Sequence, residues 1–297
     1  MTECVYLAAK ELSEIRPISV SSVLKRLGVS RSGYYDWLKR EDSPRRIRKK
    51  EIQEAILSIY EKNHRIYGAP KITIILNRNG ILVCEKTVSE YMREMGIKAR
   101  YIGHYTKTTF SEDFSNQLQN ILDQNFSPNN PNEAWCTDIT YIWTIEDEFV
   151  YLCTIMDLFS RKIIAWDISD SLCVESVIKC IETAKTRRKT ANPVIIQSDR
   201  GVQYTSEAYR QATENFILSY SHKGYPYDNA CIEAFHSLIK REWLSHYVID
   251  DIQRAKQLTF EYIETFYNTV RIHSHCGYVS PNEFERIHLS KQSEVSI

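Results

Sequence analysis

Three consecutive β-rich segments constrain the fold of this chain more than any other feature of its sequence. They cover residues 134–144, 149–157 and 162–169, and only short turns separate them. Upstream of residue 111 the apolar residues recur at helical spacing, so the periodicity of the chain changes before the first segment. The pattern predicts a three-stranded meander that follows a helical region.

The rest of the chain alternates between helical and extended patterns. We expect a helix over residues 175–189, a strand over 193–197, a helix over 207–214, a strand over 216–220, and helices over 230–244 and 251–270. Three antiparallel strands, a crossover helix and two further strands with helices are the order of a ribonuclease-H-like α/β fold. The sequence therefore predicts such a core over residues 134–250, with residues 251–297 as a C-terminal helix and tail packed on it.

Residues 1–110 are expected to form a separate helical region. Residues 19–40 around Gly28, and residues 70–95 around Asn79 and Gly80, each fit a helix, a tight turn and a second helix. This geometry predicts DNA binding, although plain helical bundles contain it too. A basic run after the first stretch either tracks phosphates or is simply solvated. The candidate DNA-contacting side chains are Arg31, Tyr35, Lys39, Arg40, Arg45 and Arg46.

The charges of the chain are unevenly distributed. The 38 Lys and Arg residues balance the 38 Asp and Glu residues, but residues 1–100 hold 20 of the basic and 12 of the acidic ones, a net charge of +8. The remainder therefore carries −8. A basic front suits a polyanionic partner, and an acidic rear suits a divalent metal or simply solubility. Residues 111–133 are polar and rich in Pro and Asn, which predicts a linker.

The sequence indicates neither a membrane segment nor a disulfide framework. No apolar run approaches the roughly 18 residues of a membrane span, and Glu3 and Glu11 stand where a signal peptide would be basic and then apolar. The eight cysteines include no Cys-x-x-Cys pair. We therefore expect a cytoplasmic protein with no membrane partner, whose cysteines are reduced and buried.

Three carboxylates stand where the expected order of elements would bring them together. Asp138 lies within the first strand, where a charge is costly without a partner or a metal, and Asp199 directly follows an apolar strand. Glu233 shares one helix face with Ser237 and Lys240. Carboxylate oxygens without cysteine or clustered histidine favour Mg²⁺ or Mn²⁺. Two such ions, about 4 Å apart, would serve phosphodiester cleavage or transfer.

Taken singly, each of these acids has a commoner role, as a surface group, a turn residue or a solvated helix side chain. Their combined order and placement favour a joint site. Asp157 and Asp228 compete for that site. We expect Asp157 to belong to a hairpin turn with a salt bridge, and Asp228 to cap a helix or fix a loop.

These residues lie in motifs that resemble those of a known family. The matching segments are WCTDITYI around Asp138, DLFSRKIIAW from Asp157, SDRGVQYTS around Asp199, YPYDNACIEAFHSLIKRE around Glu233 and YNTVRIHSHCGYVSPNEFE from Tyr267, with RIYGAPKITIILNRNGI and VSRSGYYDWLKR upstream. In this order they resemble the bacterial insertion-sequence transposases of the two-reading-frame type. The resemblance is to the second-frame product, of the DDE class, which has a retroviral-integrase-like catalytic core, and it covers nearly the whole chain.

The resemblance implies roles for individual residues. Asp138, Asp199 and Glu233 match the family's catalytic, metal-binding triad, and Lys240 matches a lysine that contacts DNA near the reacting phosphate. The alternative for Lys240 is a solvated helix lysine. The family's terminal motif either orders the last helix against the core or touches DNA, and its residues here are Arg271, His273 and Ser274.

The chain departs from the family pattern at two places. Gln197 stands where a histidine is common, and the 33 residues between Asp199 and Glu233 make a slightly short interval. The chain contains no segment resembling the first-frame protein, and in relatives the working transposase is often a frameshift fusion of both frames. The implied partners are the element's terminal repeats, target DNA, further copies of the chain on paired ends, and the first-frame product or a fusion with it.

We therefore expect a DNA transposase that cleaves element ends and transfers the freed strand into target DNA with Mg²⁺ or Mn²⁺. Two alternatives remain open: a DNA-binding regulator or subunit with a silent core, and a stand-alone metal-dependent nuclease of the same fold. Metal-dependent cleavage separates the regulator from both enzymes. Joining of ends separates the transposase from the nuclease.

Overall fold

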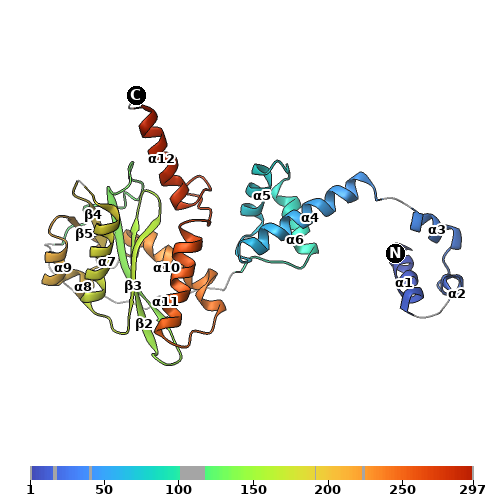
Figure 1. Cartoon of the computed structure of the whole chain (residues 1–297), viewed down its shortest axis with the longest axis horizontal. Coiled ribbons are helices and arrows are strands. Elements are labelled where there is room, and N and C mark those ends of the chain that lie inside the picture. Colours follow the sequence, from blue (N-terminus) through green and yellow to red (C-terminus); the bar gives the residue numbers. More distant parts are fainter. Residues whose placement is uncertain are drawn as a thin grey trace. The chain divides into compact units, whose positions relative to one another are not determined.

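The computed structural model describes residues 2–15, 19–39, 42–100, 118–190, 192–222 and 225–295. The chain divides into two units, residues 1–58 and residues 59–297, and the second contains the whole sheet (Figure 1). None of the helices in the described part of the chain combines the length and the apolar character that crossing a bilayer requires.

The first unit is helical. It contains α1 (Thr2–Ile15), α2 (Val20–Arg26), α3 (Arg31–Lys39) and the beginning of α4 (Pro44–Lys62). Tyr6, Ala9, Leu24 and Tyr34 form its small core. The helices on both sides of Gly28 confirm the predicted helix, turn and helix, while α1 was not predicted as a distinct helix. The basic run is itself helical, because α4 begins at Pro44.

A second helix pair opens the larger unit. α5 (Ala69–Arg78) and α6 (Glu85–Glu94) flank Gly80, whose φ of +83° lies in the left-handed region that favours glycine. Their buried faces carry Ile72, Leu76, Val88 and Met92, which recur at the helical spacing expected for an amphipathic pair.

A five-stranded mixed sheet forms the centre of this unit. Its strands are β1 (Ala134–Trp143), β2 (Phe149–Asp157), β3 (Lys162–Ser169), β4 (Ile195–Ser198) and β5 (Ile217–Tyr220), in the order β3-β2-β1-β4-β5. The first three strands are antiparallel, and β4 and β5 run parallel to β1. This arrangement confirms the predicted meander and the predicted ribonuclease-H-like order.

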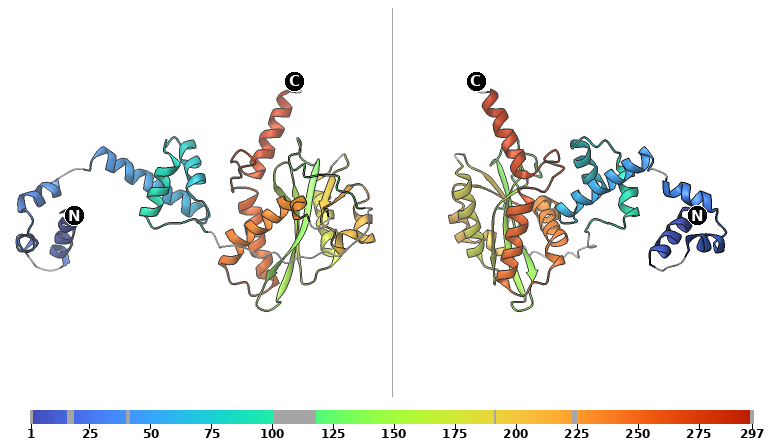
Figure 2. Two further views of the ribbon diagram at one scale, coloured as in Figure 1. Left: turned by 180° about the vertical axis from the view of Figure 1, so that it is seen from behind. Right: turned by 45° about the vertical axis from the view of Figure 1, so that its right-hand side comes forward.

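Helices cover both faces of the sheet (Figures 1 and 2). α7 (Val174–Arg188), α8 (Val202–Thr205) and α9 (Glu207–Ala212) lie on one face, and α10 (Ala230–Glu242) and α11 (Ile252–Phe260) lie on the other. The core between α7 and the sheet includes Val177 and Cys180 of the helix and Trp135, Ile155 and Ile196 of the strands. Short 3₁₀ turns at Pro226–Asn229 and Leu244–His246 flank α10.

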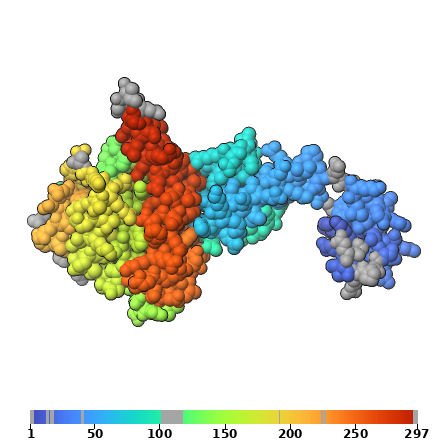
Figure 3. Space-filling view, in the orientation of Figure 1, coloured from blue at the N-terminus to red at the C-terminus, as the bar shows by residue number. Residues whose placement is uncertain are grey.

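The C-terminal region differs from the expected single long helix. α11 ends at Phe260 and continues as a π-helix over Glu261–Tyr267, and a separate helix, α12 (Pro281–Val295), follows. In the space-filling view these last helices lie along one side of the part of the unit that contains the sheet (Figure 3). A π-helical turn leaves no signature in apolar spacing, and Pro281 begins α12 because proline suits the first position of a helix.

The predicted linker is part of the larger unit from residue 118 onward; residues 111–117 lie outside the described part. The backbone N–H groups of Ile121 and Leu122 donate to the Ser219 hydroxyl of β5 at 2.8 and 2.9 Å. Asn120 donates to the carboxylate of Asp228 at 3.0 Å, and Leu122 is buried. Residues 118–122 thus pack against the edge strand of the sheet.

All eight cysteines are free. Cys136, Cys153, Cys180 and Cys276 are buried, as expected, and Cys173 and Cys231 are partly buried. Cys4 and Cys84 are exposed, so the expectation of burial is wrong for these two residues.

The helix pair α5–α6 joins the part of its unit that contains the sheet through the stretch between the π-helix and α12, residues 268–280, which we term the C-terminal turn. The Arg78 guanidinium donates to the backbone carbonyls of Tyr278 and Gly277 at 2.5 and 2.9 Å. The hydroxyl of Tyr67 accepts the N–H of Ile272 at 2.9 Å. The C-terminal turn therefore holds the helix pair on the core.

Candidate active site

Two of the predicted acids lie on neighbouring strands at the same level of the sheet. In the parallel pairing of β1 with β4, Cys136 is opposite Gln197. Asp138 and Asp199 each come two residues after that pair, so they extend the same register. Asp199 directly follows β4, at the kind of carboxyl end where α/β sheets bind ligands, and Asp138 lies at the same level within β1.

Asp199 sits in a crowded and acidic environment. Its Oδ1 accepts the N–H of Gly201 at 2.9 Å, and a Cβ on Gly201 would lie 3.0 Å from that oxygen, so a side chain there would disturb the carboxylate. Burial, followed by the negative charges of Asp138 and Glu233, raises the pKa of Asp199 to about 6. The three predicted acids are therefore electrostatically coupled.

Glu233 is presented by α10, which packs against β1 and β2. The Asn229 amide, just before α10, donates to the Thr137 carbonyl at 3.1 Å and ties the start of the helix to the strand next to Asp138. Ile232, Phe235 and Ile239 are buried while Glu233 is exposed, which confirms the predicted amphipathic helix.

His236 is a neighbour of Asp138 that sequence reasoning missed. Its Nδ1 lies 3.4 Å from Asp138 Oδ2, and its Nε2 is hydrogen-bonded to the Thr154 hydroxyl of β2 at 2.7 Å. The ring is buried, so Thr154 and the helix fix its orientation. The available signal was a histidine at position 236, one residue after Phe235, on the buried side of an otherwise apolar helix face.

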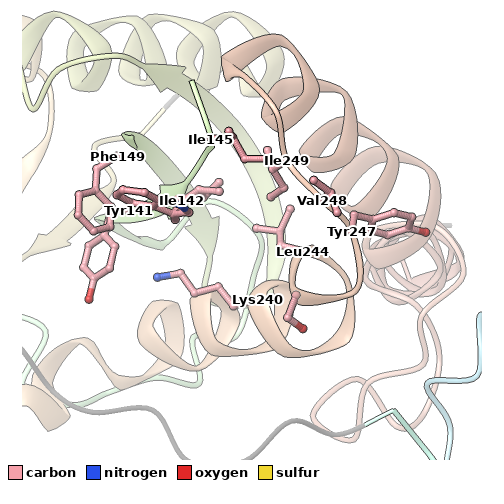
Figure 4. A pocket seen from close by; sticks show the side chains of 11 residues that line it. Tyr141, Ile142, Ile145, Phe149, Lys240, Leu244, Tyr247, Val248 and Ile249 are labelled. Atoms are coloured by element: carbon pink, nitrogen blue, oxygen red, sulfur yellow. The ribbon is translucent and has the colours of Figure 1, made fainter. Parts of the chain in front are cut away.

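Lys240 lies on the same helix, partly buried, with its Nζ 4.3 Å from the centre of the Tyr141 ring (Figure 4). Burial lowers the pKa of Lys240 to about 8, although the charge of Asp138 acts in the opposite direction. Lys240 is therefore partly desolvated, in contrast to the solvated helix lysine that was the alternative expectation for it.

The donor chemistry of the three acids fits a hard divalent cation, since all are carboxylates and their mutual repulsion would be relieved by positive charge between them. As the side chains are oriented, however, no group of three or more His, Cys, Asp or Glu residues in the described ranges is arranged to hold a metal ion. The charges of Asp138 and Glu233 act on Asp199, but the three side chains are not oriented to bind one ion together.

The two competing acids have structural partners. Asp157 is fully buried, accepts the N–H groups of Asn132 and Phe159 at 2.9 and 3.0 Å, and lies 3.4 Å from Arg188. The predicted turn and a salt bridge are present, but the salt bridge joins Asp157 to Arg188 of α7 and not to a residue of the turn. Asp228 accepts hydrogen bonds from Asn120, Gln124 and His222. Of the two roles predicted for it, it therefore has that of fixing a loop.

The predicted DNA-contacting residues of the first unit lie on helix surfaces. Arg31, Tyr35 and Lys39 follow one another at four-residue spacing along α3 and are exposed, with the Arg31 guanidinium 5.7 Å from the centre of the Tyr35 ring. Arg45 and Arg46 are exposed on α4, and Arg46 pairs with Asp42 at 3.1 Å. Arg40 lies outside the described residues.

Arg271 of the terminal motif has an ordering role. It is buried and donates two hydrogen bonds, both 2.7 Å long, to the carboxylate of Glu242 at the end of α10. The Tyr262 hydroxyl donates to the same carboxylate. His273 forms an isolated β-bridge with Val279. Of the two roles left open for this motif, Arg271 serves the ordering of the C-terminal segment against the core.

Comparison with known proteins agrees with this architecture. The family described as "Integrase core domain" matches residues 128–223 and again residues 215–281, and the family described as "HTH-like domain" matches residues 47–105. The chain is 34% identical to the transposase InsF of insertion sequence IS3A from Escherichia coli K12, over 92% of this chain and 96% of the relative. It is also 34% identical to the transposase of IS904 from Lactococcus lactis, over 83% of this chain and 98% of the relative.

A solved structure, the HTLV-2 integrase catalytic core domain in complex with magnesium, is similar with a TM-score of 0.40 and 15% identity, over 53% of this chain and 98% of that one. The integrase core and HTH-like matches, together with the identity to InsF, define an integrase-type transposase. The chain belongs to the family of insertion-sequence transposases that includes InsF of IS3. Neither the regulator nor the nuclease alternative finds support among these relatives, and the HTH-like domain implies DNA binding.

Proposed function

We propose that this transposase cleaves the ends of its element and transfers the freed strand into target DNA, with Asp138, Asp199 and Glu233 as catalytic and metal-holding residues. The observation that carries the proposal is the register of β1 and β4, which places Asp138 and Asp199 at the same level, with the start of α10 tied to the strand next to Asp138. Burial and the two other acids also raise the pKa of Asp199 to about 6. Perturbed carboxyl groups at the end of a sheet are typical of functional sites.

The reaction comprises two displacements at phosphorus. In the first, a water oxygen attacks the phosphate at the element end, and the 3′-oxygen of the element departs and takes up a proton. In the second, that 3′-hydroxyl gives up its proton as its oxygen attacks a phosphate of target DNA and displaces a target 3′-oxygen. Mg²⁺ or Mn²⁺, bound as two ions, would activate the attacking oxygen and stabilise the leaving one.

The chain's own residues position the reacting groups. His236 limits the orientations of Asp138, because its ring is itself held by Thr154. Gly201 fixes the Asp199 carboxylate through its backbone N–H. Lys240 supplies positive charge for a phosphate oxygen beside these acids, and its partial burial strengthens that attraction over one in bulk water.

DNA is held by the helical region in this proposal. Arg31, Tyr35 and Lys39 on one face of α3, with Arg40, would contact the terminal repeat, and Arg45 and Arg46 would contact phosphates. Two copies or more would act on paired ends, and the first-frame product, or a fusion with it, would complete the working enzyme.

The decisive experiment is a cleavage and strand-transfer assay with Mg²⁺ or Mn²⁺ on DNA that carries the element's own ends. Asp138→Ala, Asp199→Ala and Glu233→Ala should each abolish both steps and retain DNA binding. Asp170→Ala, which removes an exposed aspartate, should retain all three activities. A protein that binds DNA but neither cuts nor joins it, even when fused to the first frame, would contradict the proposal. A protein that cuts the DNA ends but does not join them to target DNA would instead be a nuclease.

A further inference from the structure

An open pocket of about 460 Å³ lies beside Lys240 (Figure 4). One wall consists of the second half of β1 and the start of β2, with Tyr141, Trp143 and Phe149. The opposite wall is the end of α10 and the loop after it, with Leu244 and Val248. Its volume lies within the range of roughly 300–1,000 Å³ that small-molecule sites occupy.

The two walls are joined to each other by the backbone. Ile145 donates its N–H to the Ile249 carbonyl at 3.0 Å, and Glu146 donates to the Asp250 carbonyl at 2.8 Å. The Asp147 carboxylate accepts the N–H of Ile252 at 2.8 Å. The pocket is therefore formed before any ligand enters, which reduces the entropic cost of binding.

Aromatic rings dominate the accessible surface of one wall. Trp143 is 56% exposed and Phe149 is 45% exposed, although both are large apolar side chains. Their ring centres are 4.9 Å apart at 77°, and the Tyr141 and Phe149 rings are 5.3 Å apart at 82°. Edge-to-face packing orients these rings and leaves ring surface available for a flat ligand.

The charge at the pocket narrows the choice of ligand. Lys240 lines it, with Nζ 4.3 Å from the centre of the Tyr141 ring, and the charge of Asp138 acts on the same ammonium. A nucleotide offers a flat base for the rings and a phosphate for the lysine, whereas a purely apolar partner would bury the ammonium further without adding an acceptor. Through Lys240 the pocket is linked to one of the candidate catalytic acids, because the charge of Asp138 acts on the ammonium that lines it.

We propose that this pocket binds one unpaired nucleobase of the DNA strand whose phosphate reacts at Asp138 and Asp199. The inference rests on the proposed function, because it assigns the base to the reacting strand. Stacking of the base on Trp143 and Phe149 and pairing of its phosphate with Lys240 hold the strand in register with the acids. Extrusion of a base beside a reacting bond also opens the duplex where the acids must reach the phosphate.

The test uses the full chain and a short single-stranded oligonucleotide that carries one 5-iodouracil. Photocrosslinking followed by mass spectrometry should map the crosslink to Tyr141, Trp143 or Phe149. Trp143→Ala should weaken binding of the strand by roughly 5- to 150-fold, which corresponds to about 1–3 kcal/mol per stacked base. Trp143→Phe should recover most of the affinity. Phe260→Ala, which removes an exposed aromatic ring of α11 outside the pocket, is the matched control.

A second variant, Val248→Glu, guards against loss of folding, because Val248 is 68% exposed and tolerates a polar side chain. The added carboxylate should repel the phosphate and weaken strand binding without changing thermal unfolding. Crosslinks only outside the pocket, with Trp143→Ala and Val248→Glu equal to Phe260→Ala, would overturn the inference. Self-association that Trp143→Ala abolishes, with strand binding unchanged, would overturn it in favour of a second copy of the chain.

The outcomes also separate this inference from the proposed function. Asp199→Asn should crosslink in the pocket as the unchanged protein does while losing cleavage. A protein that crosslinks through the pocket but never cuts supports the base site and refutes the transposition chemistry. If the Trp143→Ala variant cuts, joins and binds the strand as well as the Phe260→Ala control does, the proposed base site is refuted and the proposed function is not.

Discussion

Arg271 and Glu242 form a buried ion pair between the C-terminal turn and the end of α10, with both hydrogen bonds 2.7 Å long. Their side chains are 6% and 11% exposed. Burial raises the pKa of Glu242, but the hydrogen bonds and charge of Arg271 outweigh burial and hold that pKa below its usual value. The helix that carries Glu233 and Lys240 is thereby anchored at its far end.

Removing one partner of this pair should destabilise the protein strongly. Arg271→Met would leave the Glu242 carboxylate buried with the Tyr262 hydroxyl but without its cation, and we expect a loss of about 3–5 kcal/mol in the free energy of unfolding. Chemical denaturation measures this loss. The double variant Arg271→Met with Glu242→Gln should regain a large part of it. Equal stabilities for the single and double variants would show that the charge is not the cause.

Asp199→Asn should stabilise the metal-free protein at neutral pH while it abolishes cleavage. The folded-state pKa of about 6 exceeds the ordinary 3.8, so the ionised carboxylate is unfavourable in the folded state. The destabilisation of the folded protein by this carboxylate is complete above pH 6, declines as the pH falls from 6 to 3.8, and is absent below pH 3.8. Thermal unfolding in EDTA should show a rise of roughly 6–12 °C at pH 7.5, the effect of about 3 kcal/mol for a shift of about two pKa units, and little difference at pH 3.5. A lower unfolding temperature at pH 7.5 would contradict this cause.

Divalent ions should stabilise the protein through the same acids. We expect Mn²⁺ at a hundred times its dissociation constant to add about 2.7 kcal/mol to the stability of the unchanged protein, and EDTA to reverse the gain. Thermal unfolding with and without Mn²⁺ measures the effect without any need for DNA. Asp199→Asn should lose most of this stabilisation and Asp170→Asn should keep it. Equal gains in both variants would place the ion elsewhere.

Lys240→Met should weaken binding of single-stranded DNA and reduce its salt dependence. The loss of one phosphate contact lowers the slope of log affinity against log salt by about 0.7. Because burial lowers the pKa of Lys240 to about 8, its charge is present below pH 8 and is lost above it. Binding curves of the two proteins should therefore differ at pH 7 and converge above pH 8. Lys256→Met on α11 is the control, and a difference that persists at pH 9.5 would contradict the assignment.

Local patterns predict most of the fold, because strand alternation and helix amphipathicity depend on neighbouring residues. The predicted bounds of β2 and β3 are those observed, and β1 ends within one residue of its predicted end. The alignment of Asp138 with Asp199 also follows from the order of elements. By contrast, the contacts of His236 with Thr154 and of Arg271 with Glu242 join residues 82 and 29 positions apart, and no local periodicity encodes them.

The same limit explains the region before β1. Pro and Asn in residues 118–133 are typical of a linker, yet the hydroxyl of Ser219, 98 positions from Ile121, satisfies two backbone groups there. A polar composition does not distinguish a free segment from one that is fixed by distant partners. The aromatic pocket was not predicted either, since Trp143 and Phe149 fit an ordinary strand pattern and only the neighbouring loop makes them a wall.

Arg78 holds the α5–α6 pair to the C-terminal turn through the carbonyl oxygens of Gly277 and Tyr278, and the Tyr67 hydroxyl accepts a backbone N–H of the same turn. Because both contacts recognise main-chain atoms, these hydrogen bonds depend on the backbone of the turn and not on the identity of its side chains. Both contacts should therefore survive any substitution in the turn that preserves the path of its backbone.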